Sequence, residues 1–155
     1  MKLRLQPVVI PTVFGIVLVA VTIYLSGRYG LAYSYTHFDT IMHFVGGVIS
    51  AWIVVALFRH DLSSLRQWVQ VAMTIGLVLI IGLAWEIAEF STIFIKDSYP
   101  AVHFYFQGGD VRDTLGDLIV DMVGGIVFSG LYVYYQHRTL EITSATKYAK
   151  DTDLV

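Results

Sequence analysis

The sequence predicts an all-α fold of the polytopic membrane class, a bundle of four transmembrane helices. Of its 155 residues, 56% are hydrophobic and only 14% are charged, whereas soluble domains carry about 25% charged residues. Four mostly apolar runs also approach the roughly 20 residues that a helix needs to cross a hydrocarbon core about 30 Å thick. These runs cover residues 8–25, 41–58, 69–90 and 118–135. Residues 1–136 therefore form the expected transmembrane domain.

The same composition excludes several classes of function. The mean hydropathy of +0.67 is too high for a disordered chain. Lysine and arginine together number 10, against 12 aspartates and glutamates, so the chain lacks the basic excess typical of nucleic-acid binding. The absence of cysteine rules out disulfide scaffolds, thiolate metal sites and thiol nucleophiles. We expect the chain to contact a lipid bilayer and no nucleic acid.

The first apolar run has some features of a signal peptide, because Lys2 and Arg4 precede it. However, Pro7 and Pro11 interrupt its start, and no convincing small-x-small cleavage site follows. We therefore interpret residues 8–25 as an uncleaved anchor helix.

The basic residues predict how the four spans are oriented. Lysine and arginine near the ends of membrane helices remain cytoplasmic. Seven of the ten basic residues lie on one side of the four spans, and only Arg28, Lys96 and Arg112 lie on the other. Both termini and the loop 59–68 are thus predicted to be cytoplasmic. Residues 137–155 are polar and lack apolar periodicity, so we expect a cytoplasmic tail that is partly disordered.

Carboxylates gather at the predicted outer ends of the second, third and fourth runs. Residues three or four apart share a helix face. Asp39 and His43 have this spacing if their helix begins by about Thr36, and so do Glu86 and Glu89. The aspartates that lead into the fourth run follow at steps of three, four and four. Seven of the twelve acids belong to this layer: Asp39, Glu86, Glu89, Asp110, Asp113, Asp117 and Asp121.

These polar stripes must face the interior of the bundle. An ionised carboxylate at the bilayer centre costs about 2.5 kcal/mol or more even on the most lenient scale. Only Arg112, Lys96 and a protonated His43 are near enough in the sequence to balance the acids. The surplus therefore requires a bound metal, protonated carboxyl groups, or a watery path for cations.

Two of the runs also resemble one another. The segments DTIMHFVGGVIS from Asp39 and DLIVDMVGGIVFS from Asp117 both have an acid, then a His or Asp four residues later, then a glycine pair. A similar apolar start, GIVLV from Gly15 and GLVLI from Gly76, precedes each copy. We interpret this as a parallel repeat of two helical hairpins. The small glycine pairs, at 46–47 and 124–125, would let the helix backbones approach closely.

A histidine among carboxylates is a plausible ligand set for a divalent metal ion. The many carboxylate oxygens favour Mg or Mn, and the imidazole of His43 makes Zn a further candidate. Glu89 and Glu86 are the candidate catalytic residues, with Glu89 suited to act as a general base beside the metal. The predicted metal ligands are Asp39, His43, Glu86, Asp113, Asp117 and Asp121.

This pattern favours a metal-dependent hydrolase or transferase that acts on a lipid-like or envelope substrate, because the site lies at the membrane interface. Two alternatives explain the same residues. A small proton- or cation-coupled transporter or channel would use their titration, and a structural or accessory protein would use them for contacts between helices. A homo-oligomer is compatible with each of the three.

The motifs FDTIMHFVGG, WEIAEF and GGDVRDTLGDLIVDMVGG together resemble the uncharacterised bacterial YjdF-like inner-membrane proteins and, more distantly, VanZ-like proteins. The resemblance covers about residues 36–130. It implies a multi-pass protein of the plasma (inner) membrane and, through the VanZ-like members, a link to the cell envelope. The residues that match are Asp39, His43, Glu86, Glu89, Asp110, Asp113, Asp117 and Asp121.

Overall fold

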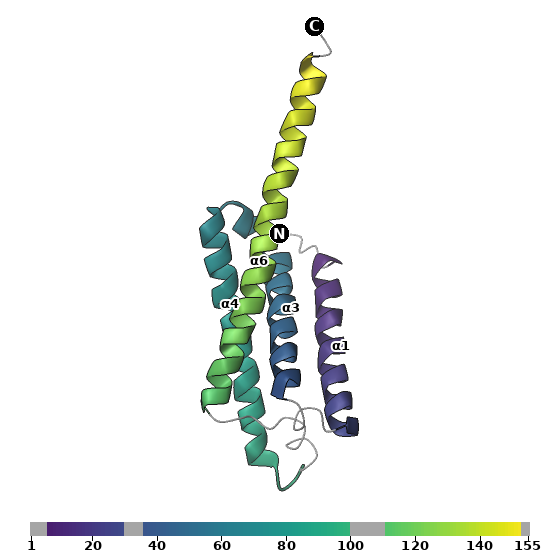
Figure 1. Ribbon diagram of the computed structural model, residues 1–155, viewed down its shortest axis with the longest axis vertical. Coiled ribbons are helices and arrows are strands. Elements are labelled where there is room, and N and C mark those ends of the chain that lie inside the picture. Colours follow the sequence, from purple (N-terminus) through teal and green to yellow (C-terminus); the bar gives the residue numbers. More distant parts are fainter. Residues whose placement is uncertain (1–5, 30–35, 100–110, 153–155) are drawn as a thin grey trace.

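A computed structural model describes residues 6–29, 36–99 and 111–152. In these residues the chain is helical and contains no strand, so the predicted all-α class is confirmed. The described residues form four long helices, and Figure 1 shows that consecutive long helices run in opposite directions. The helices are α1 (Gln6–Tyr29), α3 (Thr36–Ser63), α4 (Gln67–Ser91) and α6 (Val111–Thr152), with a short 3-10 helix, η1 (Thr92–Ile95), after α4.

Each of the four long helices includes a stretch that is long and apolar enough to cross a membrane. The candidate spans are Pro7–Ser26, His37–Ser63, Gln67–Ile95 and Val111–Thr143. Each span contains the corresponding run predicted from the sequence and extends beyond it at both ends, and most of the residues in its apolar window are not buried. Outward-facing apolar residues are expected where lipid rather than water surrounds the bundle.

Two of the three helix ends that carry acids are explained by local interactions. Helix α3 begins at Thr36, which puts Asp39 in its first turn, where the positive end of the helix dipole stabilises a carboxylate. At the end of α4 the hydroxyl groups of Ser91 and Thr92 donate hydrogen bonds to the carbonyl groups of Ile87 and Glu89. The carbonyl group of Glu89 belongs to the last turn of α4, where carbonyl groups lack the usual partner within the helix, and it also accepts a hydrogen bond from the backbone N–H group of Thr92.

Helix α6 extends further than the sequence predicted. The polar segment from residue 137, expected to be partly disordered, continues the helix as far as Thr152, and Figure 1 shows this end reaching beyond the other three helices. Extending a helix needs no new nucleus. An ion pair between His137 Nδ1 and Glu141 Oε1, at 3.2 Å and one turn apart, also links successive turns.

Helices α3 and α6 run in the same direction and cross closely at their glycine pairs. A Cβ atom added to Gly47 would overlap the backbone carbonyl of Asp121, and one added to Gly124 would overlap the carbonyl oxygen of Phe44. Only glycine permits this approach, so the predicted packing role is confirmed for these two residues.

Helix α1 is attached to the bundle differently from α4. Helix α4 packs against both α3 and α6, whereas the one extensive contact of α1 within the described residues is with α3. Figure 1 shows α1 at the edge of the bundle beside α3. The two hairpins of the predicted repeat therefore share the α3–α6 crossing but differ in how their first helices pack.

Candidate functional site

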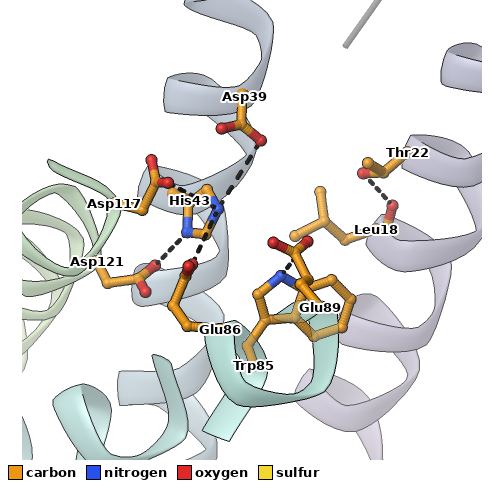
Figure 2. A network of polar contacts seen from close by, with 9 residues as sticks. All are labelled: Leu18, Thr22, Asp39, His43, Trp85, Glu86, Glu89, Asp117 and Asp121. Carbon is orange, nitrogen blue, oxygen red and sulfur yellow. Dashed lines mark hydrogen bonds and ion pairs between the residues drawn. The ribbon is translucent and has the colours of Figure 1, made fainter. Parts of the chain in front are cut away.

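The candidate site lies at the end of the bundle where α3 and α6 begin and α4 ends. Three helices contribute side chains: α3 provides Asp39 and His43, α4 provides Glu86, and α6 provides Asp117 and Asp121. Figure 2 shows the four carboxylates pointing toward the imidazole ring of His43. We call these five residues the His43 cluster. The convergence predicted from helix spacing is thus present for these five residues.

The two imidazole nitrogens face different carboxylates. Nε2 of His43 lies 3.8 Å from Oδ1 of Asp39, 3.8 Å from Oε1 of Glu86 and 3.9 Å from Oδ2 of Asp117. Nδ1 lies 3.5 Å from Oδ1 of Asp121. The three carboxylates around Nε2 come from three different helices. Asp121 stands apart from them on the opposite side of the ring.

The cluster is buried, so any charge in it that is not balanced is energetically unfavourable. His43, Glu86, Asp117 and Asp121 are each at most 8% exposed, and Asp39 is half-buried. One imidazole can carry at most one positive charge, against four carboxylates. Unbalanced charges in a low-dielectric interior cost several kcal/mol each. The cluster therefore needs a further positive charge or additional protons.

The arrangement around Nε2 suits a metal ion. One ligand atom from each of Asp39, His43 and Asp117 can be chosen so that all three lie within 4.8 Å of one another. Oε1 of Glu86 is buried and makes no hydrogen bond within the described part of the chain. Metal–ligand distances of about 2.0–2.2 Å place neighbouring ligand atoms roughly 3–4 Å apart. The separations of 3.8–3.9 Å fit this range and exceed hydrogen-bond length.

Asp121 occupies the position of a residue that orients the imidazole. A metal-bound histidine commonly directs its second nitrogen toward a carboxylate, which fixes the orientation of the ring. The side chain of Asp121 has room because a glycine faces it on α4, and a Cβ atom on Gly82 would overlap Oδ2 of Asp121. Sequence reasoning missed Gly82. Its position, one turn before Glu86, was the available signal.

Other predicted site residues lie outside the His43 cluster. Glu89 is half-buried and accepts a hydrogen bond of 2.8 Å from Nε1 of Trp85, and in Figure 2 it lies toward Leu18 of α1. Asp113 is exposed and lines a separate hollow of about 290 Å³ together with Arg112 and Asp117. Asp110 lies outside the described residues.

A cavity of about 230 Å³ adjoins the cluster between α1, α3 and α4. Its walls are largely aliphatic, and its polar residues include Asp39, His43, Glu89 and Asp121. The cluster is therefore reachable from the side of the bundle where α1 and α4 face each other. This cavity was not predicted from the sequence.

The comparison with known protein families gives a match over most of the chain. A family model described as a predicted membrane protein (DUF2238) matches residues 3–138. This range includes every residue of the His43 cluster, and the match is consistent with the resemblance to YjdF-like membrane proteins. No curated protein and no solved structure matches the chain. The chain belongs to the DUF2238 family of predicted membrane proteins.

Proposed function

We propose that the protein is a membrane-embedded, metal-dependent hydrolase or transferase that acts on an amphiphilic substrate. Asp39, Glu86, Asp117 and Nε2 of His43 would hold one divalent ion. This proposal rests on one observation. Oxygens from three helices surround a single imidazole nitrogen at 3.8–3.9 Å, and the Glu86 oxygen among them is buried without a hydrogen bond.

The ligand set favours particular metals. Three carboxylates and one imidazole form an oxygen-rich set, which suits Mg or Mn, and four ligands that include a histidine also suit Zn. A divalent ion would offset part of the negative charge that one imidazole cannot balance. A bound ion of this kind supplies Lewis-acid activation of water and of a phosphoryl or carbonyl group.

The other side chains would act around that ion. Asp121, beside Nδ1, would keep Nε2 directed toward the metal. Glu89 lines the adjoining cavity, and the Trp85 N–H group holds its carboxylate. This position suits a general base that receives a proton from the attacking water. The resemblance to VanZ-like proteins points to an envelope amphiphile as the natural substrate.

The packing beyond the cluster favours this proposal over cation transport. Val78 lies one turn from Gly82 toward the opposite end of the bundle and is fully buried. A Cβ atom on Gly125 would already contact the Val78 side chain at 3.3 Å. A transport route needs a polar or water-filled path through the bilayer, and the contact between α4 and α6 at this depth is apolar and close.

The proposal is tested by metal retention in the purified, full-length protein in detergent. The protein is incubated with Zn, Mn or Mg, freed of unbound metal, and analysed for its elements. We expect the wild type to retain one of these metals in stoichiometric amount, and His43→Ala and Asp117→Asn to lose it. Removing a ligand leaves the remaining buried charges without their shared cation.

Asp113→Asn is the matched control, because it makes the same chemical change one turn earlier on α6 at an exposed position. We expect this variant to retain the metal. Retention of no metal by the wild type, or equal retention by Asp113→Asn and Asp117→Asn, would overturn the proposal.

A further inference from the structure

The cavity beside the His43 cluster exists because α1 and α4 do not pack together. Helix α1 makes its one extensive contact with α3 among the described residues, and the side that faces α4 lines the cavity with Leu18 and Thr22. On α4, Ile81 lines the cavity and is also 40% exposed. The cavity thus reaches the outer surface of the helix bundle, which in a membrane faces lipid.

The cavity is elongated along the helices. On α3 its lining residues extend from Asp39 to Ile53 along one helix face, and a separation of 14 residues corresponds to about 21 Å at 1.5 Å per residue. This length exceeds one leaflet of a hydrocarbon core about 30 Å thick. The long axis of the cavity therefore runs in the direction in which lipid chains lie.

The two ends of the cavity differ in chemistry. Toward the middle of α3 its walls include Ile49 and Ile53, with Gly15 opposite on α1. At the other end its walls include Asp39, His43 and Glu89. An apolar slot with polar groups at one end matches an amphiphile, which has a hydrocarbon chain and a head group. The volume of about 230 Å³ also exceeds the roughly 150 Å³ of an apolar cavity that accommodates benzene.

We infer that this cavity binds one hydrocarbon chain of a phosphate-bearing membrane lipid and directs the lipid's phosphate toward the His43 cluster. This inference rests on the proposed function, because a phosphate approaches carboxylates only if a cation lies between them. The lipid enters sideways from the bilayer past Ile81, and its chain lies against Leu18 and Ile53. The lipid thereby reaches the site without leaving the membrane.

The test uses a phosphatidylglycerol that carries a photoactivatable diazirine in one acyl chain. The full-length protein is placed in phosphatidylcholine nanodiscs that contain a small fraction of this probe and manganese, and is then irradiated. Mass spectrometry locates the labelled residues. We expect strong labelling of Leu18, Ile53 and Ile81, and only background labelling of Ile80, which is exposed but does not line the cavity.

Two glycines provide a blocking variant and its matched control. Gly15 lines the cavity, and a Cβ atom there would lie 3.5 Å from Cγ2 of Ile49. Gly76, its counterpart in the repeat, has nothing within 4 Å of an added Cβ atom. We expect Gly15→Leu to reduce cavity labelling to the level at Ile80, and Gly76→Leu to leave it unchanged. Leu18→Phe fills the same space without a change at a glycine and should reduce labelling at Ile53 and Ile81.

The outcomes separate this inference from the proposed function. Cavity labelling that Gly15→Leu and Leu18→Phe abolish supports binding of the hydrocarbon chain in the cavity, whether or not the elemental analysis finds a metal. If no metal is found, the proposed function fails, and with it the approach of the phosphate to the His43 cluster, while the lipid-chain site stands. Labelling spread evenly over Ile80 and Ile81, or unaffected by both blocking variants, overturns the inference. A dimer in nanodiscs whose second copy protects Ile81 from the probe also overturns it.

Discussion

The two hairpins of the repeat, α1 with α3 and α4 with α6, are alike at one contact and different at another. Their second helices cross at Gly47 and Gly124. Each of these two helices supplies two residues to the His43 cluster. Their first helices differ, because α4 packs against both α3 and α6 while α1 packs against α3. Helix α4 contributes Glu86 to the cluster, whereas α1 contributes the wall of a cavity. The shared contact thus builds the candidate metal site, and the difference gives that site an opening toward lipid.

The largest expected effect comes from breaking the shared contact. Gly47→Ala places a methyl group against the backbone carbonyl of Asp121, so α3 and α6 must separate. We expect a loss of roughly 1–3 kcal/mol in the free energy of unfolding, as for other overpacked positions. The measurement is reversible unfolding of the purified protein in mixed detergent micelles.

The control for this change is Gly130→Ala on α6, where an added Cβ atom meets nothing within 4 Å. There, alanine should stabilise the helix by up to about 1 kcal/mol, because glycine is the weaker helix former. The two substitutions are therefore expected to have opposite signs. Equal effects would contradict the close crossing of α3 and α6.

A smaller and more local effect is expected at the contact between α4 and Asp121. Gly82→Ala would displace the Asp121 carboxylate from its place beside Nδ1 of His43, while the backbone of α4 need not move. We expect metal affinity to fall roughly 10–100-fold, as is typical when a residue that orients a metal ligand is lost. The thermal midpoint should change little.

Gly116→Ala is the comparison for this variant, because it lies beside Asp117 and has open space at its Cβ position. Isothermal titration with manganese compares the two variants. An unchanged manganese affinity in Gly82→Ala would show that Asp121 does not position the imidazole ring of His43.

The sequence predicted the helices and much of the cluster for a simple physical reason. Runs of apolar residues long enough to cross a bilayer have few alternatives to helix, and acids at matching depths on three helices must turn inward. Helix spacing correctly paired Asp39 with His43 and brought Glu86, Asp117 and Asp121 to them. The predicted orientation of the termini remains a prediction.

Other features of the structure could not be predicted from the sequence. Periodicity shows which face of α6 carries Asp117 and Asp121, but not that one lies at Nε2 and the other at Nδ1 of the same ring. Helix α1 is apolar on all sides, so its sequence contains no signal for the face that packs on α3 or for the cavity beside it. The helix beyond residue 137 was missed because hydropathy reports burial and not the low cost of extending an existing helix.

The most direct test of the candidate metal site is X-ray absorption spectroscopy of the full-length protein loaded with zinc. We expect one imidazole nitrogen and several carboxylate oxygens at about 2.0–2.2 Å from the metal. Site-bound zinc, and with it the imidazole signal, should be lost in His43→Ala and retained in Asp113→Asn. A zinc environment made only of oxygen, or an imidazole signal that survives His43→Ala, would contradict a metal site built around Nε2 of His43.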